Sequence, residues 1–202
     1  MIVTVAHHKG GVGKTTTAVH LAAFLQTKAP TLLLDGDSTR SATKWSQRGP
    51  GFPFRVADEV QAAKLARQYE HVVIDTGQKP TDAELKELAG ACDLLVIPAV
   101  PATMDTDGLV DMLKALASLG ATNYRVLIVK DPPPPETEGA AIRADLTAED
   151  VPLFGTSIPR LKAFERAAAS GVTVNDLSGD PRAKRAWAAY EAVGQEVLGH
   201  GH

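Results

Sequence analysis

The sequence predicts an α/β fold in which helices cover both faces of a mostly parallel, twisted sheet. Short apolar runs alternate with longer amphipathic stretches along the chain, and several of these runs are unbroken series of Val, Ile and Leu. Unbroken runs are typical of strands buried on both faces, as strands of parallel sheets are. A glycine-rich loop follows the first run directly and precedes the first helical pattern.

The elements follow from these patterns in chain order. Strands are predicted at residues 2–6, 31–34, 72–74, 94–97, 125–129 and 154–158. Helices are predicted at residues 14–26, 39–48, 57–69, 82–91, 107–119 and 181–198. Apolar residues recur near helical spacing in the last helix, so we expect it to pack on the domain. Four consecutive prolines at residues 132–135 predict a stiff loop after the fifth strand.

Composition sets the broad class of protein. A length of 202 residues fits one domain, residues 1–202, and a net charge of −3 argues against an all-round basic surface for nucleic acid. Cys92 is the only cysteine, which excludes an internal disulfide and a four-thiolate metal site. The apolar runs are all shorter than the roughly 20 residues that span a bilayer. We therefore expect a cytoplasmic protein.

The glycine-rich loop has the composition of a phosphate-binding loop. It comprises Lys9, Gly10, Gly11, Val12, Gly13, Lys14, Thr15 and Thr16. The glycines let backbone N–H groups point inward at a helix N-terminus, which suits a polyphosphate. Lys14 can reach the β- and γ-phosphates of ATP, and the Thr15 hydroxyl can bind Mg²⁺. Because His8 stands where the common pattern has glycine, the loop is a variant of the P-loop.

Three aspartates follow predicted strands. Asp35 and Asp37 come after residues 31–34, and Asp75 comes after residues 72–74. Ligands bind beyond the carboxyl ends of parallel strands, so all three are expected on the rim that carries the phosphate loop. We assign Asp75 to Mg²⁺ through water, Asp35 to the surrounding metal shell and Asp37 to the attacking water. An aspartate in this place is often only a turn or cap residue, but the nearby loop favours a functional role.

With residues 9–16, the Asp35-x-Asp37 pair and residues 72–76, the chain resembles the ParA/MinD family of partition and positioning ATPases. The resemblance implies a P-loop NTPase of the deviant Walker A type, close in length to short plasmid-type ParA proteins. It also implies an ATP-bound homodimer in which Lys9 reaches the phosphates of the partner subunit. Slow ATP hydrolysis would be stimulated by a ParB-like or other adaptor protein, and the cargo would be carried on the nucleoid.

The chain departs from the family pattern at two loops. Ser38 and Thr39 stand where the family often has Pro-Gln, and residues 77–80 replace a Pro-Pro pair. Both loops sense nucleotide state in the family, so the kinetics of switching are open. Adenine contacts are expected after the fifth strand, at Lys130, Asp131 and Pro132.

The C-terminal part of the chain is basic. Between residues 158 and 187 the bases are Arg160, Lys162, Arg166, Arg182, Lys184 and Arg185. With three acids this segment has a charge of +3, and the rest of the chain is −6. The asymmetry predicts weak DNA binding without sequence preference, as the family's C-terminal arm provides. The alternative is an ordinary solvated helix face.

Other functions remain open from the sequence. A MinD-like membrane ATPase would need a strongly apolar C-terminal helix with flanking bases, whereas this one carries Glu191 and Glu196, so we expect no membrane contact. A metabolic ATP-dependent enzyme on the same scaffold would need a substrate pocket that the sequence does not locate. A nucleotide-binding switch without turnover is also possible.

Overall fold

A computed structural model describes residues 1–77, 80–101 and 106–200, and its centre is a six-stranded sheet in the order β3-β2-β4-β1-β5-β6. The strands are β1 Ile2–Val5, β2 Thr31–Gly36, β3 Arg55–Ala57, β4 His71–Thr76, β5 Leu94–Ala99 and β6 Tyr124–Ile128. Every pairing between them is parallel, as the sequence predicted.

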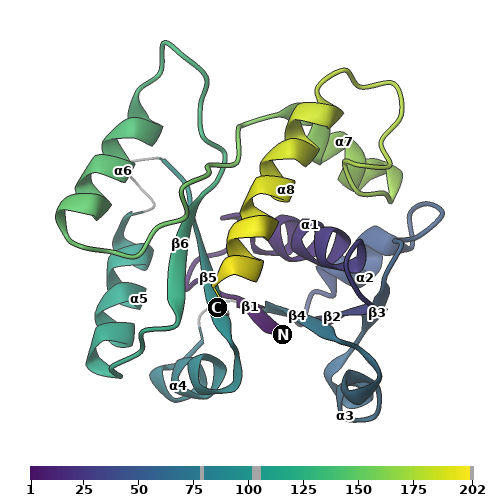
Figure 1. Ribbon diagram of the computed structural model, residues 1–202, viewed down its shortest axis with the longest axis horizontal. Helices are drawn as coiled ribbons and strands as arrows, with labels where there is room; N and C mark the ends of the chain where they lie inside the picture. Colours follow the sequence, from purple (N-terminus) through teal and green to yellow (C-terminus); the bar gives the residue numbers. More distant parts are fainter. Residues whose placement is uncertain (78–79, 102–105, 201–202) are drawn as a thin grey trace.

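Helices cover both faces of this sheet (Figure 1). They are α1 Lys14–Gln26, α2 Ser41–Ser46, α3 Glu59–Leu65, η1 Ala66–Gln68, α4 Asp82–Ala91, α5 Thr106–Ser118, α6 Glu138–Ala148, α7 Lys162–Ser170 and α8 Ala183–Gly199. In Figure 1, α1 and α8 lie side by side on one face, while α3 and α4 lie beyond the other. The fold is therefore the expected three-layer α/β arrangement.

Alternating residues of the central strands face the two helical layers. Leu33 and Val73 belong to the core that includes α1 and α8, whereas Leu32 and Val72 belong to the core beneath α3. By the same alternation, residues two places after Leu33 and Val73 face the α1 layer. This register directs the side chains of Asp35 and Asp75 toward the first turn of α1.

Several elements differ from the sequence predictions. The bounds of α1 and α4 match, but β3 was not predicted, and the helix predicted from residue 57 begins only at Glu59. Asp58 sets that start, because its side chain accepts a hydrogen bond of 2.9 Å from the Gln61 N–H and caps α3. Helices α6 and α7 were also not predicted.

The strand predicted at residues 154–158 is wrong. Phe154 N–H donates to Val126 O at 3.0 Å, and the next bond to β6 is from Ile158 N–H to Ile128 O at 2.8 Å. In a continuous parallel ladder Thr156 would make that second bond. The backbone N–H groups of Gly155 and Thr156 instead donate to the Glu196 carboxylate of α8, at 2.7 and 3.0 Å. The segment therefore loops out between isolated bridges to the sheet edge.

The α1–α8 contact generates a test of the packing. A Cβ on Gly194 would lie 2.1 Å from Cδ1 of the buried Phe24 ring. We predict that Gly194→Ala lowers the free energy of unfolding by roughly 1–3 kcal/mol, because the two helices must separate. Urea unfolding measures this change.

Gly90 of α4 is the matched control, because a Cβ there meets no atom within 4 Å. Gly90→Ala should raise the free energy of unfolding by about 0.5–1 kcal/mol, as expected for a helical glycine. Equal stabilities of Gly194→Ala and the unaltered protein would contradict the packing described here.

Candidate functional site

The phosphate loop connects β1 to α1 and depends on two left-handed glycines. Gly11 has φ +77 and Gly13 has φ +90, and Gly13 is the N-cap residue of α1. Residues with a Cβ rarely adopt these angles, so this path of the loop strongly favours glycine at both positions. The turn brings the loop onto the N-terminus of α1, where backbone N–H groups favour an anion.

Lys14 is a nearly buried cation at the start of α1. Its side-chain Nζ donates to the Lys9 carbonyl at 3.1 Å, and its exposed fraction is 6%. Burial lowers the pKa of Lys14, and the negative charges of Asp75 and Asp37 oppose that shift. A buried ammonium group close to the loop attracts a polyanion more strongly than an exposed one, because the local dielectric is low.

The rest of the loop is fixed by polar contacts on both sides. The Lys9 backbone N–H donates to His7 Nδ1 at 2.9 Å, and Lys130 Nζ donates to Gly11 O at 2.8 Å. Lys130 therefore ties the segment after β6 to the phosphate loop. Its neighbour Asp131 donates its own N–H to Ile158 O at 2.9 Å. The structure thus brings Lys130 beside the loop, and contact of Lys130, Asp131 and Pro132 with adenine stays a prediction.

Strand register brings two aspartates together at the rim. In the sheet Val5 pairs with Asp75, and Asp75 pairs with Asp35. Adjacent strands lie about 4.8 Å apart, so both carboxylates occupy one small region in front of α1. Asp37 follows two residues later and is 7% exposed. The structure therefore places the three aspartates and the phosphate loop on one rim.

Asp75 is completely buried, and neither of its carboxylate oxygens has a hydrogen-bond partner in the part of the chain described. Its pKa is raised to about 7, with burial as the largest cause; the charges of Asp35 and Asp37 add to the increase, while the Thr15 hydroxyl and Lys14 oppose it. An ionised carboxylate in such a place is unstable unless a cation neutralises it. Asp75 thus fits the predicted Mg²⁺ site.

Asp35 is only partly available to a metal. Its Oδ2 accepts bonds from the Thr43 backbone N–H at 2.8 Å and from the Thr43 hydroxyl at 2.6 Å, while its buried Oδ1 has no partner among the described residues. Asp37 accepts the Thr39 N–H at 2.8 Å through Oδ1. Thr43 was missed from the sequence, because a threonine eight residues after an aspartate is not a signal by itself.

The described residues contain no group of three or more His, Cys, Asp or Glu side chains that could hold a metal ion alone. Mg²⁺ commonly keeps water and uses one or two carboxylates together with substrate phosphates. The assignment of Thr15, Asp35 and Asp75 to Mg²⁺ stays a prediction.

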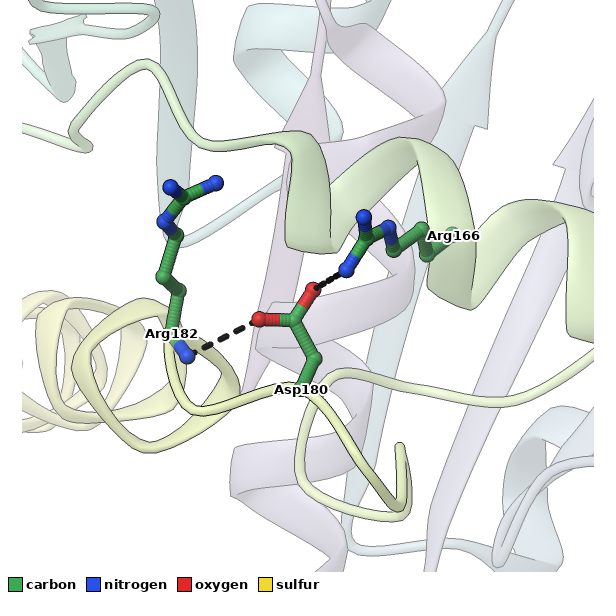
Figure 2. A network of polar contacts seen from close by, with 3 residues as sticks. All are labelled: Arg166, Asp180 and Arg182. Atoms are coloured by element: carbon green, nitrogen blue, oxygen red, sulfur yellow. Dashed lines mark hydrogen bonds and ion pairs between the residues drawn. The ribbon is translucent and has the colours of Figure 1, made fainter.

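All six predicted DNA-binding cations are exposed, two of them also form ion pairs, and their contact with DNA stays a prediction. Arg166 pairs with Asp180 at 2.8 Å, and the Arg182 backbone N–H donates to the other oxygen of Asp180 at 2.9 Å (Figure 2). Arg160 pairs with Glu136. The side chains of Lys162, Lys184 and Arg185 are exposed. Gln78 and Lys79, part of the second sensing loop, lie outside the described residues.

The family model of the CobQ/CobB/MinD/ParA nucleotide binding domain, named CbiA, matches residues 3–174. The chain belongs to this family. The resemblance inferred from the phosphate loop and the aspartates is thus confirmed, and so is the P-loop ATPase fold.

One relative in sequence agrees with this family, and two solved structures share the fold. The chain is 35% identical to maintenance of carboxysome distribution protein A of Gloeobacter kilaueensis, over 97% of this chain and 93% of the relative. An ATP complex of a Cyanothece McdA variant has a TM-score of 0.74 at 19% identity, covering 98% of this chain and 96% of that one. Cobyrinic acid a,c-diamide synthase of Mycobacterium smegmatis, with bound ADP and magnesium, has a TM-score of 0.69 at 17% identity and coverages of 98% and 94%.

The raised pKa of Asp75 predicts a pH-dependent penalty on folding. Its pKa is about 7 in the folded protein, against about 3.9 for an unfolded aspartate, so the folded state favours the protonated form. The penalty is absent well below pH 4, grows as the pH rises, and is complete above pH 7. Asp75→Asn should therefore be more stable than the unaltered protein at pH 8, by up to about 4 kcal/mol.

Urea unfolding at pH 5 and pH 8, without Mg²⁺ or nucleotide, measures this difference. The stability gap between Asp75→Asn and the unaltered protein should widen from pH 5 to pH 8. A gap that is the same at both pH values would show that Asp75 ionises normally.

Proposed function

We propose that this protein is an ATP-dependent dimerisation switch that hydrolyses ATP slowly and positions a cargo on nucleoid DNA. The observation that carries the proposal is the juxtaposition of the buried cation Lys14 with Asp75, whose buried carboxylate has no hydrogen-bond partner in the described structure, at a phosphate loop. A sequence identity of 35%, along nearly the whole chain, to a protein named for carboxysome distribution supports a role in positioning cargo. The cargo would be a plasmid, a chromosome region or a protein assembly.

Each residue of the rim has a separate task in this proposal. The loop from Lys9 to Thr16 binds the phosphates, with Lys14 on the β- and γ-phosphates. Thr15, Asp35 and Asp75 would hold Mg²⁺, which neutralises phosphate charge when it is bound. Asp37 orients the water that attacks the γ-phosphate. One of its carboxylate oxygens, Oδ1, accepts a hydrogen bond from the Thr39 backbone N–H.

Lys9 is the residue that makes the proposed ATP-bound state a dimer. Its carbonyl accepts a hydrogen bond from the Lys14 ammonium group, so the backbone at Lys9 lies against Lys14. In an ATP-bound dimer, the Lys9 ammonium group would stabilise phosphate charge on the partner subunit, as a cation supplied in trans. Hydrolysis followed by release of inorganic phosphate would remove that charge and let the two subunits separate, with an adaptor protein accelerating hydrolysis.

The contacts of α8 favour this function over a membrane ATPase. Tyr190, Val193 and Val197 are buried in the core shared with α1, and Glu196 is bound to the backbone of residues 155–156. The apolar face of α8 is therefore already covered by the domain. No helix in the described ranges is both long and apolar enough to cross a bilayer.

The fold alone does not separate cargo positioning from metabolism, because a cobyrinic acid a,c-diamide synthase has the same fold at 17% identity. The higher identity to the carboxysome distribution protein favours positioning. Binding to DNA would use the exposed cations of the C-terminal segment, which are Arg160, Lys162, Arg166, Arg182, Lys184 and Arg185. Dimerisation doubles that patch and thereby links DNA affinity to ATP.

Replacing Asp37 by alanine tests the switch. Asp37→Ala should reduce ATP turnover by about 100-fold or more, because the attacking water loses its acceptor. The variant should accumulate as a dimer with ATP and Mg²⁺, and this dimer should bind DNA at low salt. Light scattering after size exclusion gives the mass, and DNA retention is measured in parallel with ATP and with ADP.

Asp145→Ala, at an exposed position of α6, is the matched control and should behave as the unaltered protein. Unaltered turnover in Asp37→Ala would remove Asp37 from catalysis. Equal mass and DNA retention with ATP and ADP would contradict the switch.

A further inference from the structure

Arg40 has a backbone conformation that does not suit an arginine. It has φ 54 and ψ 45, in the left-handed region, and it is the N-cap residue of α2. Glycine and asparagine adopt this region far more readily, and both are also better N-cap residues. The Arg40 side chain makes no capping hydrogen bond to α2. The backbone conformation therefore gives no reason for an arginine here, so we expect the side chain to provide one.

The side chain of Arg40 contacts Asp35, near the end of β2, and its backbone contacts Asp37, just after that strand. The guanidinium group donates from NH1 to the Asp35 carbonyl, and the Arg40 backbone N–H donates to the Asp37 carbonyl at 2.9 Å. Thr43, one turn further into α2, holds the Asp35 carboxylate from the other side. Arg40 thus closes the loop of residues 35–40 into a fixed turn between β2 and α2.

A comparison with the other left-handed residues supports a specific role. Among described residues other than glycine, only Lys130 and Asp150 share a positive φ with Arg40. Asp150 lies in an exposed turn after α6, where aspartate is common. Arg40 and Lys130 both lie at the nucleotide rim, and each donates from a cationic side chain to a backbone carbonyl of that rim. Strain is therefore concentrated where the loops of the site must be held.

We propose that Arg40 is a positioning residue for ATP hydrolysis, whose guanidinium group fixes the Asp35–Asp37 turn so that the Asp37 carboxylate points at the attacking water. The inference rests on the proposed ATPase function. A fixed turn lowers the cost of orienting Asp37 in the transition state, and it has little effect on the phosphate contacts made by the loop before α1. Loss of the guanidinium group should therefore reduce kcat more than nucleotide affinity.

Glycine and asparagine at position 40 separate the side chain from the backbone. Arg40→Gly and Arg40→Asn both permit φ 54, so neither variant is expected to unfold more easily than the unaltered protein. We expect kcat for ATP to fall roughly 10- to 100-fold in both, while KM changes by less than about threefold. Arg40→Lys, which keeps a cation without the planar fork, should recover part of the lost kcat.

Lys44→Ala is the charge-matched control, because Lys44 is an exposed cation of the same helix. It should leave kcat unchanged. A melting temperature measured for each variant shows whether it is folded. If Arg40→Gly and Arg40→Asn are folded and hydrolyse ATP at the unaltered rate, Arg40 has only a structural role and the inference is wrong, while the proposed function stands. If the unaltered protein shows no ATP turnover with Mg²⁺, the proposed function fails, and this inference fails with it.

Discussion

The Asp75 carboxylate is the constraint on which the nucleotide rim depends. It lies at the end of the central strand β4 with no exposed surface and no hydrogen-bond partner in the described structure. Folding must remove this group from water, and Lys14 lies close enough to act on it electrostatically. The balance favours a site that gains stability when a divalent cation arrives, since such a cation supplies the missing opposite charge. Because the negative charge of this buried carboxylate is not fully neutralised by the protein, the site is suited to binding metal and polyphosphate together.

The surrounding elements hold the groups that meet at Asp75. Parallel register aligns Val5, Asp75 and Asp35 across three strands, and left-handed glycines turn the loop after β1 back onto α1. On the α1 face, a buried His20 donates from Nδ1 to the Thr16 carbonyl at 2.7 Å and accepts the Val174 N–H at 3.1 Å. Burial lowers the pKa of His20 to about 4, so it stays neutral and keeps both bonds. The segment between α7 and α8 is thereby joined to the first turn of α1.

Patterns that depend on local sequence could be predicted, and contacts between distant segments could not. The unbroken apolar strands, the glycine-rich loop and the aspartates at the carboxyl ends of β2 and β4 are visible in the sequence, and the family assignment confirms the fold that they indicate. The strand predicted at residues 154–158 was wrong because Glu196, 40 residues away, binds its backbone N–H groups. Strand β3 is only three residues long and too short for a periodic signal. The hydrogen bonds from Thr43 to Asp35 and from Lys130 to Gly11 join residues that are separated in the sequence, so only the folded structure shows them.

Proton release on nucleotide binding tests most directly whether Asp75 is the counter-charge for the bound metal. Calorimetric titration with Mg²⁺ and a non-hydrolysable ATP analogue, in two buffers of different ionisation enthalpy, counts the protons released. At pH 6 Asp75 is mostly protonated before binding, since its pKa is about 7. The unaltered protein should then release close to one proton more than Asp75→Asn, and the difference should vanish by about pH 9. Equal proton release by the two proteins at pH 6 would contradict the account.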